Sequence, residues 1–280
     1  MLKSLTISID ELINLKNKIL EKKLVREPVK SDYELLRVND GKIKLIVYKS
    51  GKVVYEDTIA AEKLIKEILE FDRGFHYLLG SDETGKGEWY GPLVVTAVSL
   101  SPEQVIKLRQ RNVRDSKQLS KEKLFEIGTL LHKMNIVEKT VVLRPKKYNS
   151  MYDKFIKEGK NLNDLLAWAH SAAIKDVLKA TKRELNIKLV IDKFDVKKMD
   201  LRLNTLDKSN IEIIQKSKGE SFIPVATASI IAKLTFEEEV NKLNEKYNID
   251  LRRSTPEKIN KEILPFVAKT HFKNVIKYLE

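Results

Sequence analysis

The chain of 280 residues is long enough for one large domain or for a domain with a small companion. Its 53 Lys and Arg residues outnumber 40 Asp and Glu residues, so the formal net charge is +13 at pH 7. This surplus suits a polyanionic partner, although it equally suits a protein that only needs solubility. The absence of Cys excludes disulfides and cysteine-based catalysis and fits a cytoplasmic location. No segment has the character of a signal peptide or a membrane span, so we expect a soluble protein.

The N-terminal part of the chain is expected to form a small helix-and-sheet unit. Apolar residues at helical spacing predict a helix over residues 3–25, which Ser8 or Asp10 would cap. Alternating apolar residues then predict three strands and a short helix, over 33–38, 42–48, 51–57 and 60–69. The stretch 71–74 is typical of a boundary, so we predict domains at 1–72 and 73–280.

The rest of the chain alternates between strand-like and helical patterns. Apolar runs predict strands over 76–80, 91–100, 189–191 and 212–215. Helical periodicity predicts helices over 102–111, 121–133, 162–184 and 224–247, and a C-terminal pair of segments over 257–263 and 273–279. This alternation predicts an α/β architecture with a mixed β-sheet flanked by helices.

Chemically active residues concentrate in residues 80–87, whose sequence is GSDETGKG. The spacing nearly matches a phosphate-binding P-loop. The hydroxyl that would hold Mg²⁺ is replaced by Gly87, and two carboxylates inside the loop would repel phosphates. The following segment is rich in β-forming residues, whereas a P-loop must open a helix that faces the anion. We therefore reject the P-loop interpretation.

Asp82 and Glu83 can instead act as metal ligands, because Mg²⁺ prefers carboxylate oxygens. Two such ions, about 3.5–4 Å apart, can hydrolyse a phosphodiester. Adjacent carboxylates on a regular strand point to opposite faces. We expect the glycines that follow directly to end the strand and remove this restriction. An exposed acidic turn is the alternative. Asp192 ends an apolar run, and burying a lone carboxylate is costly, which favours a functional site there.

The run Asp82-Glu83-Thr84-Gly85-Lys86-Gly87, followed by Tyr90-Gly91-Pro92, resembles the signature of the type 2 ribonucleases H. Three later segments resemble the same family, namely 114–119 (RDSKQL), 190–192 (VID) and 218–233, which contains KGE and ATASIIAK. Segments at 147–149, 161–170 and 268–274 resemble the ribonuclease HIII group in particular. Residues 48–55 resemble the TBP-like substrate-binding domain of that group.

This resemblance implies an RNase H-like core with a mixed β-sheet flanked by helices, plus a small N-terminal TBP-like α+β domain. It implies an endoribonuclease that hydrolyses the RNA strand of RNA–DNA hybrids by two-metal-ion catalysis. Mg²⁺ or Mn²⁺ would be the cofactor, and the products would carry 3′-hydroxyl and 5′-phosphate ends. The catalytic, metal-binding acids that it implies are Asp82, Glu83, Asp192 and Glu220. A hybrid-binding protein without turnover is the alternative, and acids in all four places favour the enzyme.

Substrate contacts are expected from two parts of the chain. Backbone and side chains of the Gly-rich loop, with Lys117, would contact sugars and phosphates, including the 2′-hydroxyl of RNA. The aromatic and cationic residues of the small domain would add stacking and charge. The expected contact residues are Ser81, Thr84, Gly85, Lys86, Gly87, Lys117, Tyr48, Lys49 and Lys52. Lys86 stands where type 2 enzymes often carry Arg.

Two further residues compete for places in the site. Asp195 lies close to Asp192 and is the competitor of Glu220 as the fourth acid. His271 is the histidine that we would test as a group that assists departure of the leaving group from the scissile phosphate. We expect the other histidines to be structural. Nothing in the sequence suggests a dimer seam, so a monomer is the expectation.

Overall fold

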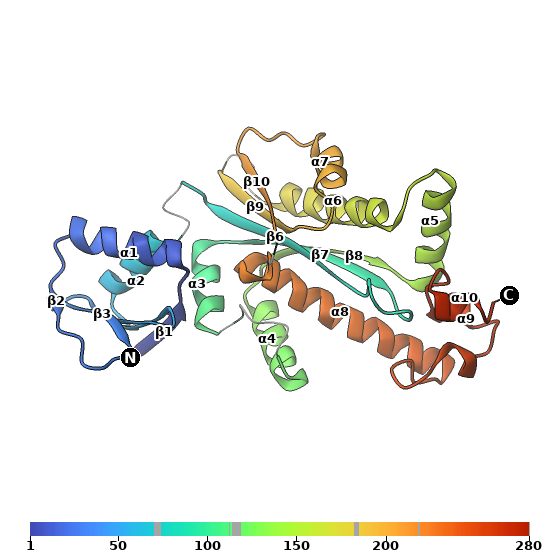
Figure 1. Cartoon of the computed structure of the whole chain (residues 1–280), viewed down its shortest axis with the longest axis horizontal. Helices are drawn as coiled ribbons and strands as arrows, with labels where there is room; N and C mark the ends of the chain where they lie inside the picture. The colour runs from blue at the N-terminus through green and yellow to red at the C-terminus, as the bar shows by residue number, and fades with distance from the viewer. Residues whose placement is uncertain (70–73, 112, 114–118, 182–184, 218, 280) are drawn as a thin grey trace.

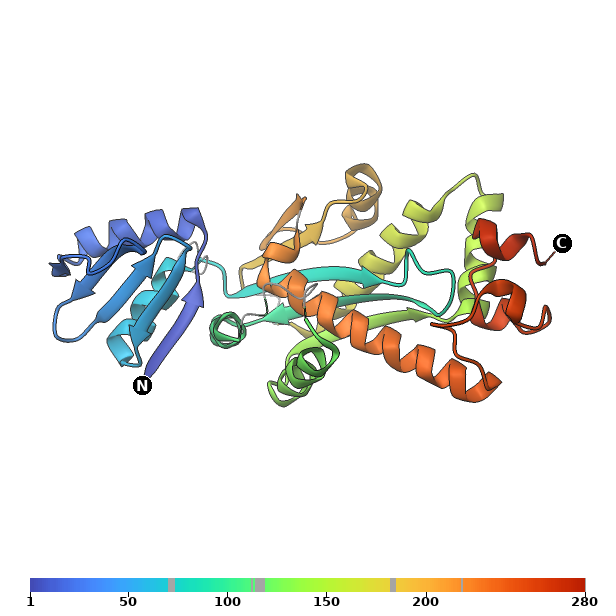
Figure 2. The ribbon, with the colours of Figure 1, turned by 60° about the horizontal axis from the view of Figure 1, so that its bottom comes forward.

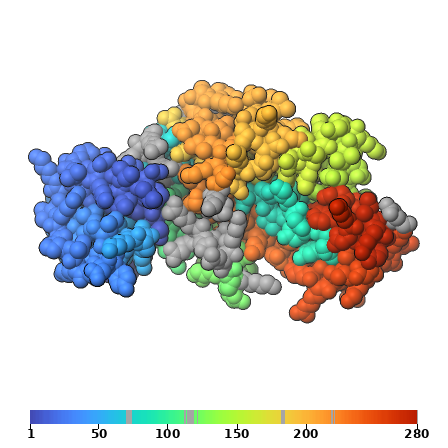
Figure 3. Space-filling view, in the orientation of Figure 1, coloured from blue at the N-terminus to red at the C-terminus, as the bar shows by residue number. Residues whose placement is uncertain are grey.

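The computed structural model describes residues 1–69, 74–111, 113, 119–181, 185–217 and 219–279, without the side chains of Lys121 and Glu220 (Figure 1). Two five-stranded sheets, each with its own helices, lie side by side along the long axis of the molecule. The space-filling view shows the smaller unit at one end (Figure 3). The predicted domain boundary, between residues 72 and 73, falls outside the residues that the structure describes and stays a prediction.

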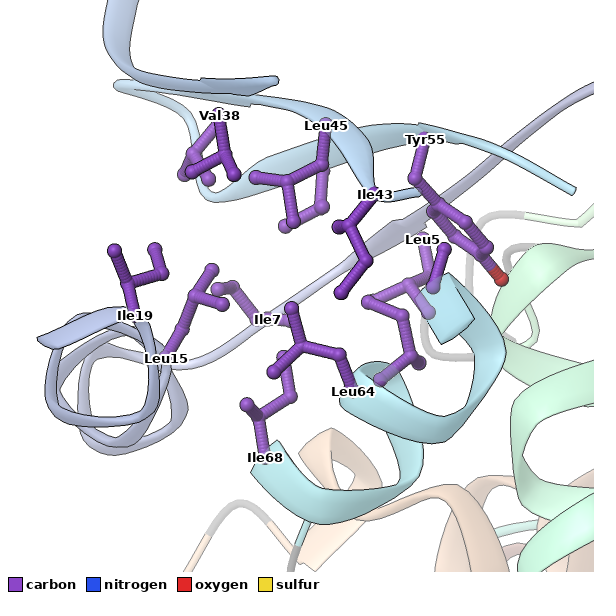
Figure 4. Packing of buried hydrophobic residues seen from close by; sticks show 14 of the residues in the cluster. Leu5, Ile7, Leu15, Ile19, Val38, Ile43, Leu45, Tyr55, Leu64 and Ile68 are labelled. Carbon is purple, nitrogen blue, oxygen red and sulfur yellow. The ribbon is translucent and has the colours of Figure 1, made fainter. Parts of the chain in front are cut away.

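The smaller sheet is antiparallel throughout, in the order β1-β5-β4-β3-β2. Its strands are β1 (Leu2–Thr6), β2 (Arg26–Glu27), β3 (Glu34–Asn39), β4 (Lys44–Tyr48) and β5 (Lys52–Glu56). Helices α1 (Ile9–Glu21) and α2 (Ile59–Ile68) cover one face only. Leu15, Val47 and Ile65 are among the buried residues of this core, part of which Figure 4 shows.

The prediction of one helix over residues 3–25 is wrong at its beginning. Residues 2–6 form β1, which pairs with β5, because the alternation of Leu5 and Ile7 places both side chains in the small core. Ser8, one of the two predicted caps, then caps α1 and forms a capping box with Glu11. The helix ends at Glu21, before the residues that the sequence pattern included.

The larger sheet is mixed, as predicted, and its strand order is β10-β9-β6-β7-β8. Its strands are β6 (Tyr77–Thr84), β7 (Leu93–Leu100), β8 (Val137–Leu143), β9 (Ile187–Asp192) and β10 (Ile211–Lys216). β9 is parallel to both β10 and β6, whereas β7 is antiparallel to both β6 and β8. Strand β8 was not predicted, because the adjacent charges of Glu138 and Lys139 interrupt the apolar pattern of its sequence, VEKTVVL.

Long helices cover both faces of the larger sheet. α6 (Leu162–Ala180) packs on one face, and α8 (Ile223–Tyr247) crosses the other beneath β6 and β7 (Figure 2). Gly80 allows the first turn of α8 to touch β6, since a Cβ there would lie 2.3 Å from the backbone nitrogen of Val225. The other helical segments are α3 (Pro102–Gln110), α4 (Lys121–Lys133), α5 (Pro145–Lys157), α7 (Val196–Leu203), α9 (Leu264–Val267), α10 (Lys273–Ile276) and two short 3₁₀ turns, η3 (Gly219–Ser221) and η4 (Pro256–Lys258). In the described part of the chain, no helix is both long enough and apolar enough to cross a membrane.

Helix α3 of the larger unit docks onto the smaller one. Ile106 belongs to the small core, and Gln110 donates to the hydroxyl of Tyr55 at 2.8 Å. Arg109 makes a buried bidentate ion pair with Glu11, with N···O distances of 2.7 and 2.8 Å. Breaking such a pair leaves an uncompensated buried charge. The contact therefore holds the two units in a defined arrangement.

Candidate active site

Asp82 and Glu83 lie on β6 within a regular stretch of strand. The ladder to β7 continues through both residues to Thr84, which is opposite Val94. Their side chains therefore point to opposite faces of the sheet. The expectation that the glycines would end the strand early and remove this restriction is wrong, because the hairpin keeps its pairing as far as Thr84.

Asp82 faces α8, where Ser229 hydrogen-bonds its carboxylate. Burial, together with the negative charge of Glu83, raises the pKa of Asp82 to about 6. No described residue forms an ion pair with this carboxylate or with that of Asp192. Asp82 is therefore a half-buried carboxylate that forms no ion pair with a described residue, although the charge of His170 acts to lower its pKa.

Glu83 faces α6 and contacts His170, which is almost completely buried. Nε2 of His170 lies 3.2 Å from Oε2 of Glu83, and Nδ1 lies 2.6 Å from Oγ of Ser81. Lys86 Nζ lies 3.7 Å from the other carboxylate oxygen of Glu83. Burial acts to raise the pKa of Glu83, but His170 and Lys86 outweigh it and hold the pKa below its ordinary value.

His170 is a residue that the sequence analysis missed, since histidines other than His271 were expected to be structural. Its imidazole bridges Ser81 and Glu83 and stacks on Phe194, with the ring centroids 5.2 Å apart. The sequence offers a weak signal, namely a polar side chain amid the apolar residues of a buried helix. Ser81, in turn, is fully buried with its hydroxyl on His170, which directs that hydroxyl into the protein.

Asp192 ends β9, the parallel neighbour of β6. The last residue pair between these strands is Ser81 with Ile191, so Asp82 and Asp192 are the next residues of each strand. Equivalent positions on neighbouring parallel strands face the same way, which places Asp192 beside Asp82. The backbone nitrogen of Gly219 donates to Oδ1 of Asp192 at 2.9 Å.

Glu220 follows Gly219 in η3, directly before α8. Its backbone is thus one residue from the amide that binds Asp192, and its side chain is not among those described. The competing Asp195 is the N-cap of α7, with Oδ1 accepting from the backbone nitrogen of Lys198 and Oδ2 from Asn163. Both oxygens of Asp195 therefore have partners in the protein.

The chemistry of these donors fits a hard divalent cation, which binds carboxylate oxygens. Asp82 and Asp192 supply such oxygens side by side, without a cation partner among the described residues. Among the described side chains, no group of three or more His, Asp or Glu is already gathered tightly enough to enclose a metal ion. The opposite orientation of Glu83 explains this finding in part.

The loop 85–92 joins β6 to β7 beside these acids. Gly85 adopts a φ of +92°, and a Cβ there would lie 2.1 Å from the carbonyl oxygen of Pro92, so the loop requires glycine at this position. Thr84 and Lys86 are half-exposed on the same stretch, and Gly87 has open space around its Cα. Lys117, the remaining expected contact near the site, lies outside the described residues. His271 is stacked on Tyr152 of α5, at 4.3 Å between ring centroids.

The contact residues expected in the small unit lie on or beside the sheet face that no helix covers. Tyr48 is the last residue of β4 and Lys52 the first of β5, and both alternate with buried neighbours. Lys49 lies in the turn between these strands and is exposed. Tyr55 faces the opposite way, into the small core, where its hydroxyl contacts Glu62 at 3.1 Å.

Three comparisons with known proteins point to the same family. The family model described as Ribonuclease HII matches residues 79–275. Ribonuclease HIII of Chlamydia pneumoniae is 31% identical, covering 93% of this chain and 92% of its own length, and that of Chlamydia caviae is 29% identical, covering 92% and 91%. The fold matches the crystal structure of Bst-RNase HIII in complex with Mn²⁺, with a TM-score of 0.65, 22% identity, and coverage of 100% of this chain and 98% of that one. The chain therefore belongs to the ribonuclease HIII group of the type 2 ribonuclease H family of endoribonucleases.

Proposed function

We propose that this protein hydrolyses the RNA strand of RNA–DNA hybrids by two-metal-ion catalysis, leaving 3′-hydroxyl and 5′-phosphate ends. The observation that carries the proposal is the position of Asp82 and Asp192 on neighbouring parallel strands, beside the turn that contains Glu220. Membership of the ribonuclease HIII group supports the substrate class. Mg²⁺ or Mn²⁺ is the proposed cofactor, in keeping with the Mn²⁺ complex of the Bst relative. A monomer in the cytoplasm stays the prediction for the protein's state and location.

Asp82 and Asp192 would hold the metal ions, with Glu83 and Glu220 as the additional acids. When bound, the ions supply an activated water and stabilise the leaving oxygen of the phosphodiester. The protein's part is to direct Asp82 and Asp192 toward one place. The amide of Gly219 orients Asp192, and Ser229 orients Asp82. Both hydrogen bonds leave further carboxylate oxygen lone pairs available for a cation.

His170 would act on Glu83 as a positioning residue. It contacts one oxygen of that carboxylate and is itself held by Ser81, so the imidazole has no freedom to turn. The Gly-rich loop would contact the RNA sugar and phosphate through Lys86 and the backbone of Gly85 and Gly87. The uncovered face of the small sheet would hold the hybrid through Tyr48, Lys49 and Lys52.

Replacement of one central acid tests the mechanism. Asp82→Asn keeps the size of the side chain but removes the negative charge that would bind the metal. We expect cleavage of a labelled RNA–DNA hybrid to fall by more than about 10³-fold, the scale seen when one member of a catalytic unit is lost. Hybrid binding, measured by fluorescence anisotropy, should change little.

The matched control for this variant is Asp195→Asn. Asn is as good an N-cap as Asp, so α7 should stay intact and cleavage should stay near the wild-type rate. Normal cleavage by Asp82→Asn would exclude the proposed mechanism. Loss of cleavage in Asp195→Asn would instead make that residue a necessary acid and displace Glu220 from the proposal.

Removal of the imidazole tests the positioning of Glu83. In His170→Ala the carboxylate loses its contact, and we expect the Mn²⁺ concentration for half-maximal cleavage to rise about 10–100-fold, the usual cost of losing a group that orients a ligand. The control is Ser171→Ala, which removes a neighbouring buried hydroxyl that donates to the backbone carbonyl of Trp168 within α6. Equal metal dependence in both variants, after correction for any loss of folded protein, would refute the positioning of Glu83 by His170.

Substitutions on the small sheet test its contact with the hybrid. Deleting residues 1–72 would leave Arg109 without Glu11 and expose Ile106, so surface changes give a cleaner result. We expect Lys49→Ala/Lys52→Ala to weaken hybrid binding and to reduce the slope of log K against log [salt] by about 2, because each phosphate contact contributes about 0.9. The turnover rate at saturating hybrid should be unchanged. Lys16→Ala/Lys18→Ala makes the same charge change on α1 and should leave the slope unaltered; equal slopes in the two double variants would reject this surface.

A further inference from the structure

Lys269 is the most completely buried charged residue among those described, with an exposed fraction of 0%. Its Nζ donates to the backbone carbonyl oxygens of Glu88 at 2.8 Å, Tyr90 at 3.0 Å and Gly91 at 2.9 Å. Its backbone nitrogen donates to the carbonyl oxygen of Trp89 at 2.7 Å. Lys269 therefore donates hydrogen bonds to the carbonyl oxygens of four consecutive residues, 88–91.

These carbonyl groups belong to the second half of the loop between β6 and β7. The ladder between the two strands stops at Thr84 and Val94, so the loop has no strand partner of its own. Buried backbone carbonyls that lack a partner are costly. The C-terminal segment supplies the partner, since Gly91 also donates to Val267 at 2.9 Å and Tyr90 bridges Ala268.

Three carbonyl acceptors call for an ammonium group, which has three N–H donors, whereas a neutral amine has two. Burial lowers the pKa of Lys269 to about 7, and the charge of Glu88 opposes that effect. The ammonium also lies 5.7 Å from the ring centroid of Tyr148 on α5. The charge is thus held by dipoles and an aromatic face.

The segment that carries Lys269 is itself anchored to α5. The side chain of Asn149 donates to the carbonyl oxygen of Ala268 at 2.9 Å and accepts from the backbone nitrogen of Thr270 at 3.0 Å. These two bonds fix the residues on both sides of Lys269. The loop is therefore connected to α5 through Lys269 and the backbone on either side of it.

We propose that Lys269 is a positioning residue for substrate recognition, holding the loop so that Gly85, Lys86 and Gly87 face the hybrid. The inference rests on the proposed function, in which that loop contacts the RNA strand. Lys269 contacts neither the acids nor any residue expected to touch substrate, so it would act only through the loop. Its loss should raise KM for the hybrid far more than it lowers the turnover rate.

The test compares two buried lysines. Lys269→Met removes the ammonium from the loop, and Lys188→Met removes one from β9, where Lys188 lies over Phe75 and Phe222 at 5.7 and 5.5 Å from the ring centroids. Both variants are assayed well below their unfolding midpoints, which circular dichroism establishes. We expect KM to rise at least tenfold in Lys269→Met, with the turnover rate within threefold of wild type. Lys188→Met should lower the unfolding midpoint without moving KM.

A double-mutant cycle with Lys86→Ala shows whether the effect passes through the loop. If it does, adding Lys86→Ala to Lys269→Met should raise KM by less than the product of the single effects. Asn149→Ala is the second variant should Lys269→Met fail to fold. It removes the two hydrogen bonds that hold the residues on both sides of Lys269 but keeps the buried ammonium. It should also raise KM. An unchanged KM in the folded variants, or fully multiplicative effects with Lys86→Ala, would overturn the inference. Absence of hybrid cleavage by the wild-type protein would instead overturn the proposed function.

Discussion

The parallel pairing of β6 with β9 is the constraint on which the rest of the structure depends. It places Asp82, within β6, next to Asp192 at the end of β9, where carboxylates lose solvation. Burial, together with the charge of the neighbouring Glu83, raises the pKa of Asp82 to about 6, which expresses the cost of keeping a carboxylate there. A fold of marginal stability keeps such an arrangement when the charge has a use, and carboxylates are ligands that hard divalent cations prefer. The helices and loops around the acids can be understood as supports for them.

Each face of β6 has its own support. α8 approaches so closely at Gly80 that only glycine fits, and it brings Ser229 to Asp82. On the other face, α6 brings His170 to Glu83. Beyond the strand, the C-terminal segment holds the loop through Lys269. Elements from three distant parts of the sequence thus fix one short stretch of chain, as a site that must hold its groups within a fraction of an ångström requires.

The sequence predicts the mixed sheet, the two long helices that cover it and the identity of the candidate acids, because apolar periodicity and the motif around Asp82 are local signals. It does not predict β1, since Leu5 also falls at helical spacing from Ile9 and Leu12, and only pairing with β5 decides. The glycines after Glu83 suggested an early end to β6, but antiparallel pairing with β7 outweighs their local preference. The contacts of His170 and Lys269 join residues far apart in the chain, and no spacing rule reports such contacts.

The central claim is that Asp82 and Asp192 together hold divalent metal. A crystal of the protein with an RNA–DNA hybrid, soaked in Mn²⁺ and measured at the manganese absorption edge, tests it most directly. We predict anomalous difference density for an ion within ligand distance of both carboxylates, about 2.0–2.2 Å for a hard divalent cation. Ordered Mn²⁺ elsewhere on the hybrid, with no density between Asp82 and Asp192, would contradict the account.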